Sequence, residues 1–298
     1  MRHHYIPKFL LRAWTGYDGC LEYIRIDKEE LRSRRRPPRS VAFGEDLYVM
    51  DLPNTDNTDP QFVETEFLKR VDDRAAKARM KLMTGETLTP DEGEEWIVFL
   101  MSLRVRHPDA VALLRREGAK VAQELDENPW EYMASAGPGD PLTPSGWVRH
   151  NAPGYLENIG ISQLQALATD ATILEAIRTV KHHSVVDLRS CSGHLLLADN
   201  ACILVYGVDH PKFTLALPLS PRMAFVSSRS DEVTNTLQRA PLPALLKTMN
   251  QWSVEQARRQ LYAMDKSLHS FIGFHLRTLR SREDHAPRNP QRPPSGAS

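Results

Sequence analysis

The sequence predicts an α+β fold, in which segments from the two ends of the chain form an antiparallel β-sheet around a helical middle region. Short alternating segments rich in β-forming residues, such as residues 20–26, lie near the N-terminus. Patterns with apolar residues at helical spacing occupy about residues 61–180. Short apolar segments at 184–228, followed by a long helical pattern at 243–265, complete this arrangement.

The chain has 298 residues, enough for one large domain or two small ones. We expect a single α+β domain over residues 1–280, with a helical insert at about 61–180. Residues 281–298 are rich in Pro, Arg and Ser, which predicts a disordered tail.

The formal net charge is zero, with 38 basic and 38 acidic residues, so the whole molecule has no overall attraction for nucleic acid or membranes. No segment approaches the roughly 20 apolar residues of a membrane span, so we expect no membrane partner. The three cysteines lack CxxC spacing, which favours a cytoplasmic location without disulfides or a thiolate zinc site.

The N-terminal segments alternate between strand and loop patterns. Residues 20–26 predict a strand, and residues 40–51 a pair of strands around Gly44. Residues 31–40 are basic and interrupted by proline, and they predict a loop.

Helices are expected next, at residues 61–83, 89–106 and about 109–126. Thr89 and the acidic residues after it are typical of a helix start. Residues 128–154 are rich in Pro, Gly and small residues and predict a long loop, and residues 161–180 predict a further helix.

The C-terminal part predicts an antiparallel meander and then a single long helix over 243–265. Tight turns such as Ser192-Gly193 separate the apolar segments. The expected strands are residues 184–190, 194–200, 201–209, 213–220 and 222–228.

Two adjacent histidines, His3 and His4, are the first candidate site residues. Neighbouring residues of a strand point to opposite faces, so one of them would face a given pocket, as a general base or a metal ligand. The alternative is a mobile N-terminus with two solvated histidines. The nearby apolar residues, including Phe9 and Trp14, favour a packed segment.

Asp199 and Asn200 follow a short apolar segment. Asp199 could ligate a metal or orient a histidine, and Asn200 could donate a hydrogen bond to an anion. An ordinary turn explains both residues equally well. Arg106, at the end of an expected helix, could hold a phosphate or carboxylate, or simply complement the helix dipole.

Basic runs at 32–39 and 277–292 could contact nucleic-acid phosphates, although surface solvation explains them as well. No aromatic residues are interleaved within these runs, as a single-strand binding groove would require. The chain also lacks the GxGxxG, GxxxxGK[ST], HExxH and GxSxG motifs.

The opening HHYIPKFLLRAW resembles the start of the bacterial domain-of-unknown-function 4238 family. The positions that match its motif are His3, His4, Tyr5, Pro7, Phe9, Leu11, Arg12 and Trp14. Weaker resemblances lie at residues 106–108, 195–203 and 218–221, and at Asn250 with Ala257 and Arg258. The chain departs from the family pattern at Ala198, usually Ser, and at Ala201, usually Pro.

The resemblance implies a shared fold and a grouping of polar residues from distant parts of the chain, but no established activity. The implied group is His4, Arg106, Asp199, Asn200 and Asn250. We add the motif residues His3, Tyr5, Arg12 and Arg258 as candidate ligand-binding residues, together with Asn250.

Our leading hypothesis is a nuclease-like hydrolase of phosphodiesters. His4 would be base or metal ligand, Asp199 a ligand or orienting acid, Arg106 the anion clamp, and Asn200 a further catalytic residue. A divalent metal is the candidate cofactor, and nucleic acid or another phosphate-bearing ligand the candidate partner. The alternative is a non-enzymatic module that binds an anion or a partner, with the polar residues forming a structural network. A third hypothesis, a defence-associated effector, rests on no residue pattern, and the sequence indicates no oligomeric state.

Overall fold

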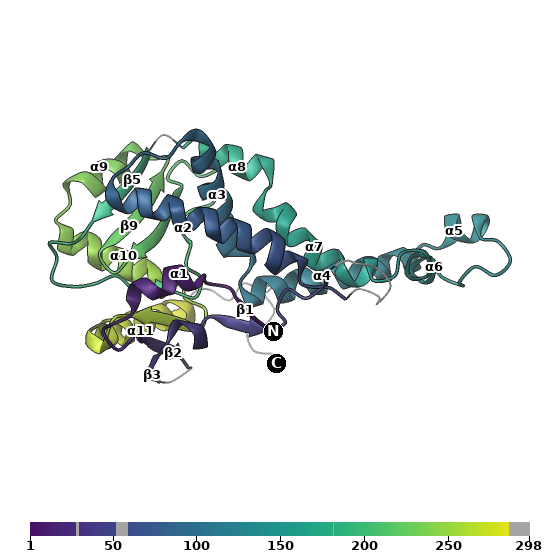
Figure 1. The fold of residues 1–298 in the computed structure, drawn as a ribbon, viewed down its shortest axis with the longest axis horizontal. Coiled ribbons are helices and arrows are strands. Elements are labelled where there is room, and N and C mark those ends of the chain that lie inside the picture. Colours follow the sequence, from purple (N-terminus) through teal and green to yellow (C-terminus); the bar gives the residue numbers. More distant parts are fainter. Residues whose placement is uncertain (28–29, 52–58, 181, 286–298) are drawn as a thin grey trace.

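The described residues form two antiparallel four-stranded sheets, a two-stranded ribbon and a helical arm (Figure 1). The computed structural model describes residues 1–27, 30–51, 59–180 and 182–285. Most of the buried side chains, from Tyr5 to Tyr262, belong to a single apolar cluster that unites both ends of the chain with the middle helices.

The first sheet joins the N-terminal and C-terminal segments, as predicted. Its strand order is β3-β2-β10-β6. The strands are β2 (Leu21–Ile26), β3 (Leu31–Arg36), β6 (Leu197–Ala198) and β10 (Gln260–Ala263). One face packs on helix α11 (His269–His285), where Ile24 and Leu261 share an apolar cluster with Ile272.

The second sheet has the order β5-β9-β8-β7 and is buried on both faces. Its strands are β5 (His182–Asp187), β7 (Ile203–Leu204), β8 (Thr214–Ser220) and β9 (Met223–Ser228). Because strand residues alternate between faces, Leu217 and Phe225 join the main core, whereas Ala216 and Val226 pack against α10 (Leu242–Gln256).

The N-terminal segment closes over the first sheet. Strand β1 (Arg2–His4) pairs with β4 (Phe43–Glu45), and these strands form the two-stranded ribbon. Helices α1 (Lys8–Leu11) and η1 (Arg12–Trp14) follow, and η2 (Pro38–Ser40) lies beside them. The Trp14 indole Nε1 donates to the Leu195 carbonyl at 2.7 Å, which ties this segment to the C-terminal half.

The middle region is helical, and part of it projects as an arm with α5 and α6 at its tip (Figure 1). Helices α4 and α7 form the arm and touch through Gly118 and Gly160, whose Cα atoms leave no room for a side chain. The middle helices are η3 (Val63–Leu68, a π-helical segment), α2 (Lys69–Thr84), α3 (Pro90–Val105), α4 (Pro108–Glu127), α5 (Trp130–Ser135), α6 (Pro144–Asn151), α7 (Tyr155–Ala168) and α8 (Ala171–Arg178).

The α+β class is confirmed, but several predicted elements were wrong. The basic segment 31–40 is strand β3 followed by η2, because its residues pair with β2 across the hairpin. The predicted loop 128–154 contains α5 and α6, and the predicted helix 161–180 is divided between α7 and α8, with the Asp170 side chain capping the second.

The C-terminal predictions also need correction. The helix expected over 243–265 ends at Gln256, since Ala257 is extended and the chain continues as β10. Strand β6 pairs with β10 and therefore leaves the expected meander. Three further elements, α9 (Asp231–Arg239), η4 (Lys266–Leu268) and α11, were not predicted. Helix α11 includes the first residues of the expected tail, and residues 286–298 lie outside the described residues.

Candidate functional site

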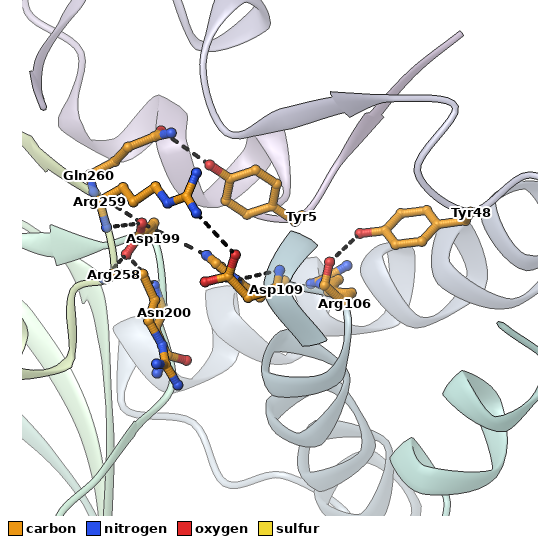
Figure 2. Close-up of polar contacts among 10 residues, drawn as sticks. Tyr5, Tyr48, Arg106, Asp109, Asp199, Asn200, Arg258, Arg259 and Gln260 are labelled. Carbon is orange, nitrogen blue, oxygen red and sulfur yellow. Dashed lines mark hydrogen bonds and ion pairs between the residues drawn. The ribbon is translucent and has the colours of Figure 1, made fainter. Parts of the chain in front are cut away.

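Asp199 is a buried carboxylate that organises a backbone turn (Figure 2). Its Oδ1 accepts hydrogen bonds from the backbone N–H groups of Asn200 at 3.0 Å and Arg258 at 2.7 Å. Its Oδ2 accepts from the N–H groups of Arg259 at 2.8 Å and Gln260 at 3.0 Å. With four donors directed at its two oxygens, the carboxylate fixes the chain where α10 ends and β10 begins.

A second set of bonds connects this turn to the N-terminal motif. The Tyr5 hydroxyl donates to Gln260 Oε1 at 3.1 Å, and the Tyr262 hydroxyl donates to the same oxygen at 2.7 Å. Burial raises the pKa values of both tyrosines, so their hydroxyls stay protonated as donors. The side chain of Asn250 acts similarly beside β6, accepting from Leu196 N–H and donating to the His194 carbonyl.

His107 lies between these groups and was not among the predicted site residues. Its Nδ1 accepts the Asp109 N–H at 3.2 Å and so caps α4, and its Nε2 is 3.8 Å from Asp199 Oδ2. The ring meets Tyr5 edge-on, with centroids 5.3 Å apart. The sequence carried two signals for this residue, its place in the family resemblance at 106–108 and its position directly before the proline that starts a helix.

Arg106 is fully buried and lies between Asp109 and Tyr48 in Figure 2, without contact to Asp199. Its Nη1 donates to Asp72 Oδ1 at 2.8 Å, and its carbonyl accepts the Tyr48 hydroxyl at 2.7 Å. Its Nε and Nη2 are buried with no hydrogen-bond partner among the described residues. Burial raises the pKa of Asp72, and burial together with the Asp72 charge raises the pKa of Glu64 to about 7.

The two histidines have different environments. His3 is buried and stacks on Tyr48, whose backbone N–H donates to His3 Nδ1 at 3.0 Å. His4 packs against Phe43, and burial together with the positive charge of Lys8 lowers its pKa to about 4. Burial also lowers the pKa of His3. Both rings are therefore neutral at pH 7.

The structure does not assemble the predicted residues into one cluster. No hydrogen bond, ion pair or ring contact between described residues joins His4, Arg106 and Asp199 to one another. Arg12 has an exposed side chain, and Arg258 contributes its backbone N–H rather than its guanidinium. Asn200 is buried, and its backbone N–H donates to Asp199 Oδ1.

A separate groove, which we call the arginine groove, collects positive charge beside the N-terminal motif. It lies between the β2–β3 hairpin and the β1–β4 ribbon and has a volume of about 480 Å³. Its lining residues are Arg2, Tyr23, Arg25, Asp27, Arg32, Arg34, Arg36, Ser40, Val41 and Phe43.

Strand pairing explains how the arginines reach one face. Directly opposite residues of an antiparallel pair share a face, and here Arg32 pairs with Arg25 and Arg34 with Tyr23. The alternate residues Ile24 and Leu31 face α11 instead. Every second residue of β3 therefore faces the groove, and these residues are Arg32, Arg34 and Arg36. The neighbouring strand β2 supplies Tyr23, an aromatic residue of the kind that the basic run itself lacks.

Only part of the positive charge in the arginine groove is neutralised. Asp27 pairs with Arg25 at 2.9 Å and lies 3.8 Å from Arg32. Arg34 and Arg36 are exposed and form no ion pair within the described part of the chain. The Arg2 guanidinium lies 4.5 Å from the centroid of the Phe43 ring. Such a concentration of guanidinium groups is the usual receptor for phosphate oxygens.

Two other kinds of feature are missing from the ranges that the structure describes. Those ranges contain no group of at least three His, Cys, Asp or Glu side chains that could hold a metal ion. Every helix in those ranges is also too short or too polar to cross a bilayer.

The fold and these sites define an α+β protein whose N-terminal motif supports a sheet with an arginine-lined face. The chain belongs to the family described as "Protein of unknown function (DUF4238)", which matches residues 2–267, nearly the whole chain. The resemblance inferred from the opening motif is thus confirmed. Comparison with curated proteins and with solved structures gives no significant match.

Proposed function

We propose that this protein binds a phosphate-bearing polyanion, nucleic acid being the expected example, in the arginine groove. The observation that supports this proposal is the alignment of Arg32, Arg34 and Arg36 on one exposed face of β3. Guanidinium groups bind phosphate oxygens in bidentate fashion and release counterions from a polyanion when they do so.

The polar network around Asp199 has a structural role in this proposal. Asp199 accepts from four backbone N–H groups, and Tyr5 is tied to Gln260. These bonds fix β10, against which β2 pairs, and so fix the floor of the arginine groove. Phosphodiester hydrolysis is not part of the proposal, because His4, Arg106 and Asp199 are engaged with different partners.

The test is a titration of a fluorescein-labelled 20-nucleotide DNA strand, followed by anisotropy at 50, 100 and 200 mM salt. We expect the affinity of the protein for the strand to fall as salt rises. The double variant Arg34→Gln, Arg36→Gln should bind more weakly at 50 mM salt. The slope of log affinity against log salt should decrease by about 0.7 for each arginine that contacts a phosphate.

A charge-matched control is Arg116→Gln, Arg178→Gln. Both arginines lie on helices outside the arginine groove, with side chains 69% and 61% exposed. Equal weakening in the two double variants would show general charge attraction and contradict the proposal. A groove variant that binds DNA normally but aggregates would also contradict the proposal. The arginines would then serve to prevent strand-to-strand association, since β3 is an edge strand.

A further inference from the structure

We infer that the polyanion bound in the arginine groove is a single-stranded nucleic acid, whose bases stack on Tyr23 and Phe43. This inference rests on the proposed function and names its ligand. It follows from the way that two aromatic rings and five arginines share one groove.

Tyr23 lies in the middle of the basic face. It pairs across the hairpin with Arg34, and Arg32 and Arg36 are its diagonal neighbours on β3. The ring is half-buried and packs at its other side on Tyr262, with centroids 6.2 Å apart. The two rings are tilted by 40° rather than stacked, so Tyr262 supports the position of the Tyr23 ring, and a base in the groove would stack on Tyr23 alone.

Phe43 provides a second ring on the opposite wall. It belongs to β4, whose pairing with β1 places Arg2 beside it, and the Arg2 guanidinium lies over the Phe43 ring at 4.5 Å. A base in contact with Phe43 would therefore have a phosphate ligand next to it. Combining an aromatic ring with a cation in this way is characteristic of grooves that bind single strands without sequence preference.

The spacing of the arginines fits an extended strand. Alternate residues of a β-strand are about 7 Å apart, so Arg32, Arg34 and Arg36 form a regular row. In a nucleic-acid strand with unstacked bases, successive phosphates have a comparable separation, and each base is free to turn towards the rings. The bases of a duplex are already stacked on one another, so Tyr23 and Phe43 would add nothing to its binding.

The experiment compares three probes at 50 mM salt: a dT20 strand, a dA20·dT20 duplex and inorganic polyphosphate of about 20 phosphates. The variants are Tyr23→Leu and Phe43→Leu, which remove a ring, and Tyr23→Phe, which keeps one. We expect dT20 to bind more tightly than either other probe. Each leucine variant should weaken dT20 binding by about 5-fold to 100-fold, as loss of one stacked base does. Tyr23→Phe should retain wild-type affinity.

Polyphosphate carries charge without bases, so its binding shows whether the groove of each variant is still formed. Unchanged polyphosphate binding combined with weakened dT20 binding would support stacking. If all three probes bind alike and Tyr23→Leu has no effect on dT20, the inference is wrong while the proposed function stands. Tighter binding of the duplex would overturn the inference as well. If no probe binds, the inference and the proposed function are both wrong.

Discussion

Asp199 illustrates how a single side chain can determine the path of the backbone. The helical pattern of α10 continues in the sequence to Met264, yet the helix ends at Gln256. The N–H groups of residues 258–260 turn towards the Asp199 carboxylate instead of completing further helical bonds. The side chain that the sequence suggested as catalytic thus has a well-defined structural role.

Replacing this carboxylate should destabilise the fold. In Asp199→Asn, an amide NH₂ group would face backbone donors that now point at an oxygen. We expect the free energy of unfolding to fall by about 3 kcal/mol, since each hydrogen bond to a charged group contributes about 1.5–3 kcal/mol. Urea denaturation of the variant measures this change. The control Asp209→Asn, at an exposed turn, should stay within about 0.5 kcal/mol of wild type.

His4 should make stability depend on pH. Its pKa is about 4 in the folded protein and about 6.5 when unfolded, so the unfolded chain takes up the proton first as pH falls. The free energy of unfolding therefore has its full value above about pH 6.5 and decreases as the pH falls from 6.5 to 4. From pH 7.5 to 4.5 this loss is about 2–3 kcal/mol.

The comparison for this prediction is His4→Gln, which cannot titrate. The wild-type free energy of unfolding should decrease more steeply over the same pH range than that of the variant. His3 and His194, whose pKa values are also lowered by burial, contribute equally to both proteins. Parallel pH profiles of the two proteins would mean that His4 is not held neutral.

The sequence identified most of these residues but not their partners. Asp199 stands out in the sequence because a polar residue beside an apolar segment needs a partner, whereas Tyr5 and Asn250 were selected through the family resemblance. Most of their partners, however, are backbone groups or side chains that only the tertiary fold brings near, such as Gln260 for Tyr5. Patterns along the chain contain no information on a partner more than 50 residues away.

At the scale of elements, the clearest error concerned β3. Its sequence LRSRRR has no apolar alternation and is followed by two prolines, which is typical of a loop. The strand forms because β2 provides the apolar face, and an edge strand can carry charge on its solvent side. Helices with regular apolar spacing were easier to predict from the sequence. Helix α3 begins with the expected Thr89 cap, which forms a full capping box with Glu92.

The contact between α4 and α7 should tolerate no added side chain. A Cβ at Gly160 would lie 2.2 Å from the Leu114 carbonyl oxygen, which is backbone and cannot move aside. We expect Gly160→Ala to lower the free energy of unfolding by about 2–3 kcal/mol or more, as overpacking does. Gly93→Ala in α3 is the matched control. Nothing lies within 4 Å of its Cβ, so helix propensity should raise stability by up to about 1 kcal/mol.

The measurement is the urea midpoint of both alanine variants. Opposite signs of change at Gly160 and Gly93 would establish that the close approach of α4 and α7, rather than glycine as such, matters. A Gly160→Ala variant as stable as wild type would mean that the two helices can separate freely.

At the scale of the whole molecule, stability should be uneven. The main core unites Leu21, Leu197 and Tyr262, whereas α5 buries no side chain and α6 buries only Ser145. In hydrogen exchange, we expect backbone amides of α5 and α6 to exchange much faster than those of β2 and β10, because local opening of the arm tip exposes little apolar surface. Equal protection of the two regions would contradict this expectation.

The projecting arm also provides a site where sequence could be inserted into the protein. Between α5 and α6, residues 136–142 form an exposed connection whose side chains lie outside the main core, and the tip points away from β2 and β3 (Figure 1). Exposed loop tips of this kind accept inserted sequence with little effect on the rest of a fold. A reporter domain or an affinity handle placed there would leave the N-terminal motif, the first sheet and both chain ends untouched, so the intact protein could be immobilised and presented to its ligands.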